Sequence, residues 1–215
     1  MRFPSDKDRH SIIGTTGSGK TQYALWCLSH RNFHTMPWLI YDFKNEESIN
    51  SIIGARHIEL NEVPTSPGIY VVHPHPDDSI GVQTQMMAIW NVGNCGIYID
   101  EGYMVGRHNP AFRSLLTQGR SKRIPMMILS QRPTWMDGFV FSESQFFSVF
   151  RLQRTKDIKN VEDFVPADLS RRLPEFHSYY YDVGENKMYV IKPVPDISII
   201  LATFERRLRP QRVAV

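Results

Sequence analysis

Eight consecutive residues near the amino terminus have the types and the spacing of a phosphate-binding loop. They match G-x-x-x-x-G-K-[ST] in full and read Gly14, Thr15, Thr16, Gly17, Ser18, Gly19, Lys20 and Thr21. In this motif glycines let backbone N–H groups surround a β-phosphate, the lysine reaches the β and γ oxygens, and the last hydroxyl ligates Mg²⁺. The pattern predicts a site for a nucleoside triphosphate and Mg²⁺. A flexible Gly-Ser turn is the alternative, and the apolar run before the motif and the helix-like run after it argue against that.

A pair of carboxylates at the end of an apolar run suits the same chemistry. Residues 97–99 are Ile-Tyr-Ile, and Asp100 and Glu101 follow them in the form of a Walker B strand. We expect Asp100 to hold Mg²⁺ through water and Glu101 to act as the general base that polarises an attacking water. Apolar strands that end in acids are common, so the assignment of Asp100 and Glu101 to a Walker B strand depends on the phosphate-binding loop earlier in the chain.

Gln131 follows the next apolar run, residues 126–130. In P-loop ATPases whose Walker B acid is followed by glutamate, this strand lies between the P-loop strand and the Walker B strand. We therefore expect Gln131 to lie between Thr21 and Glu101, where a neutral amide can contact both water and the γ-phosphate. An ordinary polar residue at a strand end is the alternative.

The elements that must position these residues alternate along the chain. Strands are expected at residues 10–13, 37–42, 69–72, 96–100, 125–130 and 146–152, and helices at residues 20–32, 46–53, 78–92 and 110–122. This alternation predicts an α/β fold with a mostly parallel sheet and helices on both faces. Near the carboxyl terminus, residues 177–182 and 187–192 flank a Gly184-Glu185-Asn186 turn, which predicts an appended antiparallel hairpin.

Length and charge place wide limits on function. The 215 residues, of which 41% are hydrophobic, suit one domain over residues 1–215. A formal net charge of +3 says little about partners. The segment 102–136 holds cations and no carboxylate, and it is either a DNA-binding face or a solvated basic face. The cations of that segment and of the tail are Arg107, Arg113, Arg120, Lys122, Arg123, Arg132, Arg206, Arg207, Arg209 and Arg212.

Other features point to a protein kept in cytoplasm-like, reducing conditions. Cys27 and Cys95 fall in apolar surroundings, which indicates core packing and not a disulfide. The His-Pro-His-Pro stretch at residues 73–76 lacks further ligands at zinc spacing, so a Pro-rich loop is the favoured interpretation. Residues 1–10 have no apolar core of a signal peptide, and no apolar run approaches the roughly 18 residues that a membrane span needs.

The order of these motifs resembles the HerA/FtsK superfamily of DNA-pumping ATPases. The segments that carry the resemblance are residues 14–21, 41–44, 99–101, 118–123, 130–133 and 147–152. Within that superfamily, the short length and the lack of added domains are similar to the genome-packaging ATPases of tailless, internal-membrane-containing icosahedral viruses. Members of that family are ring-forming motors, usually hexameric, which thread double-stranded DNA using ATP.

The resemblance implies a RecA/FtsK-like P-loop NTPase that binds ATP and Mg²⁺ and pumps double-stranded DNA into a preformed capsid. It implies a homo-oligomeric ring, partners among the capsid vertex or membrane proteins of the virion, and a place in the host cytoplasm or at the packaging vertex. A secretion, conjugation or filamentous-phage-assembly ATPase of the same superfamily is an alternative, but such proteins usually carry a membrane anchor or a large extra domain.

Alternatives from other classes share the phosphate-binding loop. A small-molecule or nucleotide kinase normally closes an Arg-rich lid over its acceptor, whereas Glu101 and Gln131 favour water as the acceptor. The sequence has no Asn-Lys-x-Asp motif for reading guanine, which disfavours a GTPase. A nucleotide switch or a structural vertex component without motor activity is a third possibility.

The resemblance also implies an arginine that acts across a subunit interface. In the family a basic residue in the region that corresponds to Arg120 neutralises charge on the neighbour's γ-phosphate. Arg120 is the first candidate and Arg123 the second, with DNA phosphate contact or a solvated helix end as alternatives. Arg151 and Arg154 are weaker candidates for phosphate sensors.

Two further segments have open interpretations. Asp42 and Lys44 either support the site from the end of the second strand or form a plain ion pair. Residues 135–141 are apolar where a loop is expected after Pro133, and exposed apolar loops usually mark interfaces. We expect this segment to pack against a neighbouring subunit, with local core packing or a pore-facing DNA contact as alternatives.

Overall fold

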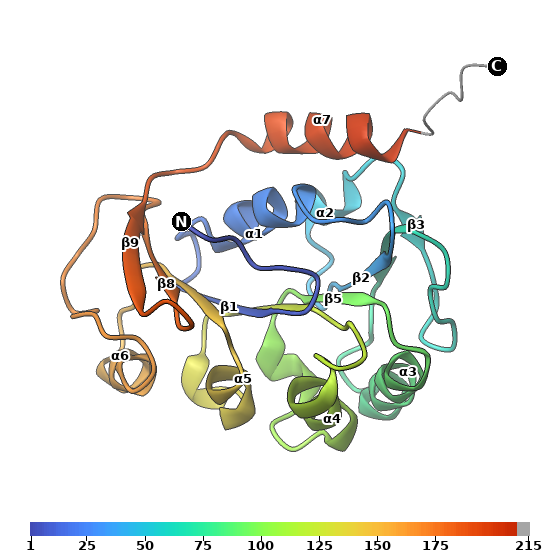
Figure 1. The fold of residues 1–215 in the computed structure, drawn as a ribbon, viewed down its shortest axis with the longest axis horizontal. Helices are drawn as coiled ribbons and strands as arrows, with labels where there is room; N and C mark the ends of the chain where they lie inside the picture. The colour runs from blue at the N-terminus through green and yellow to red at the C-terminus, as the bar shows by residue number, and fades with distance from the viewer. Residues whose placement is uncertain (210–215) are drawn as a thin grey trace.

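The computed structural model describes residues 1–209 and is built on one sheet with helices on both faces (Figure 1). Its strands are β1 (Arg9–Ile13), β2 (Pro37–Tyr41), β3 (Arg56–His57), β4 (Gly68–Val72), β5 (Gly96–Ile99), β6 (Met126–Ser130), β7 (Phe146–Val149), β8 (Ser178–Asp182) and β9 (Lys187–Ile191). Their order in the sheet is β3-β4-β2-β5-β6-β1-β7-β8-β9. All neighbouring pairs from β3 to β7 are parallel, and β8 and β9 add an antiparallel hairpin beside β7. The predicted fold class is confirmed.

The helices divide between the two faces of the sheet. They are α1 (Lys20–Ser29), α2 (Glu47–Asn50), α3 (Ser79–Val92), α4 (Pro110–Gln118), α5 (Gly138–Ser142), α6 (Thr155–Glu162) and α7 (Ile197–Leu208). In Figure 1, α1, α2 and α7 cover one face, and α3, α4, α5 and α6 cover the other. A separate apolar cluster fills each of the two layers. Strands β2, β4 and β6 are therefore buried along their whole length, which is why they read as largely apolar runs. β1 is equally buried, although it begins with the polar residues Arg9, His10 and Ser11.

The position of β6 decides how the candidate residues meet. β6 pairs with β1 on one side and with β5 on the other, so it lies between the strand that precedes the phosphate-binding loop and the strand that ends at Asp100. This is the strand order that the sequence predicts. The carboxyl ends of β1, β5 and β6 consequently lie side by side at one edge of the sheet.

Three helices end earlier than the sequence predicts. α1 ends at Ser29, α2 at Asn50 and α4 at Gln118. α4 is followed by Gly119, where a Cβ atom would lie 2.4 Å from the carbonyl oxygen of Leu115. The turn after Gly119 includes Arg123, which has a left-handed φ of 55°. The chain therefore leaves the helix before residue 122.

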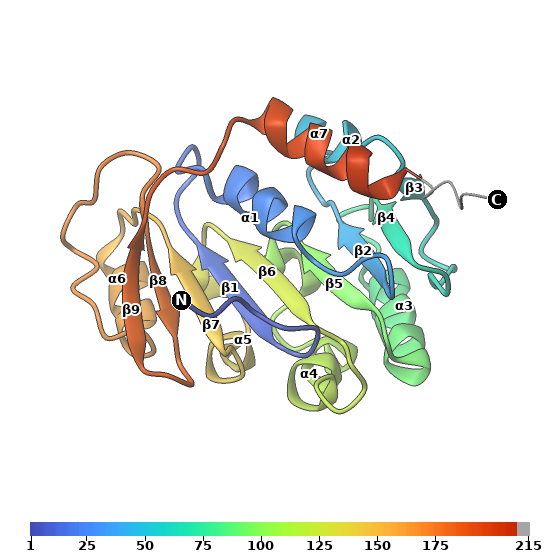
Figure 2. The same cartoon turned by 45° about the horizontal axis from the view of Figure 1, so that its top comes forward.

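Residues 197–208, which include Arg206 and Arg207, form a helix that the sequence does not predict. Figure 2 shows α7 lying along the outer side of α1, and the two helices pack together. Arg207 donates hydrogen bonds to the carbonyl oxygens of Ser29 and Arg31, the second over 2.9 Å. A cation at the carboxyl end of a helix is favourable, because that end carries partial negative charge. Arg212 lies outside the described residues.

Most of the segment 135–141 is helical and not a loop, so that part of the prediction is wrong. A short 3₁₀ turn (Pro133–Trp135) leads into α5. Met136, Val140 and Phe141 are buried in the core, whereas Trp135 is 54% exposed and Phe139 is 40% exposed. Local core packing therefore explains one side of the segment, and only Trp135 and Phe139 remain free to meet another molecule.

The two cysteines lie in the apolar core, as the sequence predicts. Cys27 and Cys95 are buried and unpaired, and burial raises the pKa of each thiol to about 12. Across residues 1–209, no three His, Cys, Asp or Glu side chains are grouped so that they could hold a metal ion. Within the same residues, no helix has both the length and the apolar character to cross a bilayer.

Candidate active site

The phosphate-binding loop connects β1 to α1 and is anchored at its base by the two neighbouring strands. The N–H of Gly14 donates to the carbonyl of Ser130 over 3.1 Å, and the N–H of Thr15 donates to the carbonyl of Arg151 over 3.1 Å. Gly17 and Gly19 have φ angles of 73° and 90°, a left-handed conformation that glycine adopts without strain. The loop thus holds a shape that residues with side chains would resist.

The first turn of α1 offers unpaired N–H groups at the centre of this loop. The residue before the helix is Gly19, so no side chain caps the amino end. Uncapped N–H groups and the positive end of the helix dipole together form an anion-binding site. Lys20 and Thr21 begin the helix, as the motif requires.

Glu101 is the point at which the candidate residues converge. Its Oε1 lies 4.0 Å from the Nζ of Lys20 and forms an ion pair with the Nζ of Lys44. Its Oε2 accepts a hydrogen bond from the backbone N–H of Gln131 over 3.3 Å. Glu101 and Lys20 are only 1% and 6% exposed. Groups from the ends of β1, β2, β5 and β6 therefore share one buried carboxylate.

The charge of Glu101 affects the pKa values of both neighbouring lysines. Burial lowers the pKa of Lys20, and the negative charge of Glu101 opposes that effect. For Lys44, burial also lowers the pKa, but the hydrogen bond and the charge of Glu101 outweigh it and raise the pKa overall. Glu101 thus favours the charged form of both ammonium groups in a region that disfavours charge.

Gln131 joins the loop to the carboxylate pair. Its side-chain oxygen accepts a hydrogen bond from the hydroxyl of Thr16, and its backbone N–H binds Glu101. This places Gln131 between the phosphate-binding loop and Glu101. The assignment of its amide to water and the γ-phosphate remains a prediction.

Asp42 shapes the loop that carries Lys44. Its two carboxylate oxygens accept hydrogen bonds from the backbone N–H groups of Lys44 over 3.3 Å and of Glu46 over 2.9 Å. His73 approaches the same carboxylate to 3.5 Å. Asp42 and Lys44 therefore do not pair through their side chains, and Lys44 is instead directed at Glu101.

Asp100 is a buried carboxylate without a protein partner. It is 1% exposed, and neither of its oxygens has a hydrogen-bond partner among the described residues. Burial raises its pKa to about 7, Lys44 opposes the rise, and the charges of Glu101 and Glu46 add to it. Two unpaired buried oxygens fit a role toward Mg²⁺, which takes oxygen ligands and usually keeps several waters.

Asp100→Asn is expected to stabilise the nucleotide-free protein, and to do so more strongly at pH 8 than at pH 5. A carboxyl whose pKa is higher in the folded state than in the unfolded state stabilises the fold fully below about pH 4. That contribution is lost as the pH rises through about 7, where the folded carboxyl ionises. Asparagine does not ionise, so the difference in unfolding free energy should grow by about 2–4 kcal/mol across this range.

Urea unfolding without Mg²⁺ at the two pH values measures this difference. Asp77→Asn is the control, because the side chain of Asp77 is 94% exposed. A stability difference for Asp100→Asn that does not change with pH would show that Asp100 is already ionised at pH 5.

The two candidate arginine fingers lie far from the loop of their own chain. Arg120 and Arg123 are exposed in the turn between α4 and β6, which lies at the amino edge of the sheet. The pKa of Arg9, at the start of β1, is lowered by burial, and the charge of Arg120 adds to that effect. The phosphate-binding loop follows the opposite end of β1. Arg120 and Arg123 can therefore act only on a neighbouring molecule's nucleotide, on DNA, or not at all.

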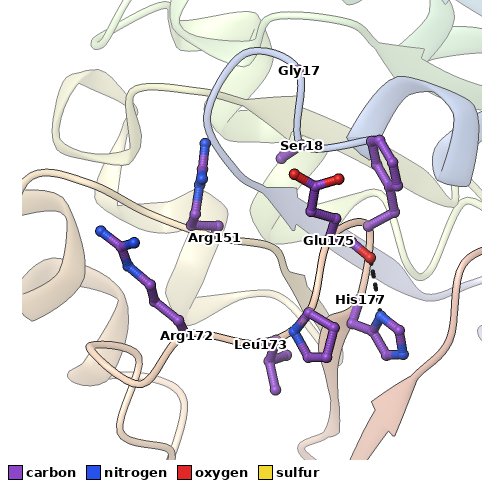
Figure 3. Close-up of a pocket in the computed structure, with 9 residues that line it drawn as sticks. Gly17, Ser18, Arg151, Arg172, Leu173, Glu175 and His177 are labelled. Atoms are coloured by element: carbon purple, nitrogen blue, oxygen red, sulfur yellow. Dashed lines mark hydrogen bonds between the residues drawn. The ribbon is translucent and has the colours of Figure 1, made fainter.

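A cavity of about 340 Å³ opens beside the phosphate-binding loop, on the side of β7. Figure 3 shows Arg151 rising beside the loop that carries Gly17, with Arg172 next to it, and the carboxylate of Glu175 directed toward the loop near Ser18. Arg151 thus lies close enough to the phosphate-binding loop to contact a bound phosphate. Residues 172–176 form an irregular segment without a motif, so the sequence does not mark them as part of the site.

Comparison with known proteins gives one relative at high identity and several similar folds. The chain is 44% identical over 218 residues to the DNA packaging ATPase P9 of Enterobacteria phage PRD1, and the match covers 95% of each chain. The genome packaging NTPase B204 of Sulfolobus turreted icosahedral virus 2, in complex with AMPPCP, matches with a TM-score of 0.71 and 18% identity over 89% of this chain and 100% of B204.

A more distant fold match comes from a secretion system. The cytoplasmic domain of the type VII secretion ATPase EccC from Thermomonospora curvata matches with a TM-score of 0.66 and 15% identity, over 95% of this chain and 28% of the EccC domain. No family model matches the chain. At these identities the structural matches establish the fold alone.

Proposed function

This chain belongs to the family of the DNA packaging ATPase P9, and from that relationship we propose that it hydrolyses ATP to pump double-stranded DNA into a preformed viral capsid. The observation that carries the chemical part is the convergence of Lys20, Gln131 and Lys44 on the buried carboxylate of Glu101. A buried base beside the phosphate-binding lysine is what hydrolysis of a γ-phosphate requires.

Each residue of the site has a separate task in this proposal. The first-turn N–H groups of α1 and Lys20 hold the β- and γ-phosphates. Thr21 and Asp100 would hold Mg²⁺, Asp100 through water, and the ion would supply positive charge next to the phosphates. Glu101 accepts the proton of the attacking water, and Gln131 orients that water.

The site favours a hydrolase over a kinase. The side of the loop nearest Glu101 is occupied by Lys44 and Gln131, which both bind that carboxylate. A base held in this way suits a small acceptor such as water. The fold alone also fits a secretion ATPase, but the 44% identical relative is a packaging ATPase.

Assembly into a ring, most simply a hexamer, completes the proposal. Trp135 and Phe139 are exposed aromatic side chains, and in this proposal they contact a neighbouring subunit. Arg120 is the proposed trans-acting finger, with Arg123 as the second candidate. The ring would meet DNA and the capsid vertex or membrane proteins of the virion, in the host cytoplasm or at the packaging vertex.

Double-stranded DNA is expected to stimulate phosphate release, and DNA affinity should fall at least about tenfold between 50 and 200 mM salt. A packaging motor holds the phosphate backbone and must move along any sequence, so counterion release dominates its binding. Phosphate-release assays with duplexes of unrelated sequence, run across salt concentrations, test both statements.

The same assay separates the alternatives. Phosphate release that depends on a small-molecule acceptor and ignores DNA would favour a kinase. Tight, salt-independent binding to one short sequence would contradict a translocase. Nucleotide binding without turnover under any of these conditions would favour a switch.

A further inference from the structure

The arrangement of strands fixes the direction in which a bound nucleotide lies. β1, which leads into the phosphate-binding loop, has β6 on one side and β7 on the other. The groups that act on the γ-phosphate, Glu101 and Gln131, follow β5 and β6. The γ end of a triphosphate on this loop therefore faces β6, and the sugar and base extend toward the side of β7.

A second pocket, of about 280 Å³, opens on that side directly beside the loop. It includes Gly19 and Gln22, which flank Lys20 and Thr21, so it is continuous with the phosphate-binding site. Its other walls are mainly apolar and aromatic, which suits the face of a nucleotide base. Among them are Phe150, Phe176, Pro193 and Val194.

Phe176 has features that core packing does not explain. Its side chain is 52% exposed, yet its backbone has a left-handed φ of 58°, which is a costly conformation for a bulky residue. A Cβ atom on Gly19 would lie 3.1 Å from its ring, so Phe176 stands directly against the phosphate-binding loop. A half-exposed aromatic ring contributes little hydrophobic stabilisation, so burial does not offset the backbone strain at Phe176. We infer that the strained conformation serves another purpose.

The segment around Phe176 is held as a turn. The N–H of His177 donates to the carbonyl of Pro174 over 3.2 Å, and the imidazole of His177 lies 3.0 Å from the carbonyl of Glu175, as Figure 3 shows. The ring of Phe176 is thus presented beside the loop before any nucleotide arrives.

We propose that Phe176 is the platform on which the base of the bound nucleoside triphosphate stacks. The inference rests on the proposed function, since it concerns the same nucleotide. Stacking uses the face of the ring and not the hydrogen-bonding edge of the base, so it recognises nucleosides as a class. Phe176 therefore adds affinity for the nucleoside part and leaves phosphate binding to the loop.

Calorimetric titration of the full chain with two probes tests this division. The probes are ATPγS and inorganic tripolyphosphate, both with Mg²⁺. Phe176→Ala should weaken ATPγS binding about tenfold, because loss of base stacking has an effect of this order. Tripolyphosphate binding should stay unchanged, and Phe176→Tyr should restore ATPγS binding to within about twofold. Val190→Ala on the edge strand β9 is the control, because Val190 is 53% exposed and lies outside this pocket.

Other outcomes overturn the inference in distinguishable ways. Equal weakening of both probes by Phe176→Ala would mean that Phe176 only supports the loop at Gly19. Unchanged binding of both probes would place the base elsewhere. Wild-type protein that binds the two probes equally would exclude a base site while leaving the ATPase proposal intact, and wild-type protein that binds neither would overturn both.

Discussion

Replacing Glu101 by glutamine is expected to slow ATP hydrolysis at least about a hundredfold while ATP still binds. Glutamine keeps the shape of the side chain but cannot accept a proton from water. Glu101 is buried beside Lys20 and Lys44, so no solvent base reaches the same position. Single-turnover hydrolysis and calorimetric ATP affinity, measured on the same preparation, separate the two properties.

Glu46→Gln is the matched control for this change. Glu46 is a partly buried carboxylate in the same loop as Lys44, and its backbone N–H binds Asp42, which the substitution does not alter. Its turnover should stay within a few-fold of the wild type. Equal losses of binding and turnover in Glu101→Gln would instead indicate that Glu101 holds the metal.

Glu101→Gln also tests the proposed arginine finger, Arg120, in rings that contain two kinds of subunit. A subunit that lacks Arg120 can still hydrolyse ATP if its neighbour supplies the arginine, whereas a subunit that lacks Glu101 cannot. Mixing Arg120→Ala with Glu101→Gln should therefore restore part of the activity. A mixture as inactive as each variant alone, in a preparation shown to form rings, would argue that Arg120 contacts DNA or has no role in hydrolysis.

Lys20→Ala is expected to abolish ATP turnover and to weaken ATP binding about a hundredfold, because the β- and γ-phosphates lose a buried positive charge. Burial already disfavours the charge on Lys20, so its ammonium group gains strongly from an anionic partner. Calorimetry with ATPγS and a phosphate-release assay measure the two effects.

Lys187→Ala is the control for Lys20→Ala. Lys187 lies on the edge strand β9, its side chain is 60% exposed, and it forms an ion pair with Glu185. Its loss should change neither binding nor turnover. Near-normal hydrolysis by Lys20→Ala would refute the phosphate-binding assignment of residues 14–21.

The parts of the fold that the sequence predicts correctly are those with strong local constraints. Parallel strands buried on both faces are mostly apolar, so β2, β4 and β6 stand out in the sequence. The residue types of the phosphate-binding loop are set by the ligand it must hold, and they place β1 and α1. The expected position of β6 between β1 and β5 is confirmed.

The missed elements have identifiable causes. β3 is only two residues long, which is too short for any periodicity. α7 does have a helical pattern, since apolar residues recur at Ile197, Ile200, Leu201 and Phe204. The arginines that follow led to its interpretation as part of a charged tail.

The missed parts of the site depend on contacts between distant residues. The sequence names Lys44 as a candidate support of the site, but its ion pair with Glu101, 57 residues away in the chain, has no local signal. Phe176 lies in an irregular segment, where neither spacing nor residue type marks its place beside Gly19. Such pairs follow from the packing of the whole sheet.

The sheet order also determines when this site can form as the chain folds. β1 emerges first, but its two neighbours are β6 and β7, which lie in the second half of the chain. Bringing such distant strands together requires closure of a long loop, and that entropic cost slows folding. β2 and β4 can pair long before, since they are close in sequence. We therefore expect the phosphate-binding loop to be completed late in folding, and a chain truncated before β6 to lose ATP binding.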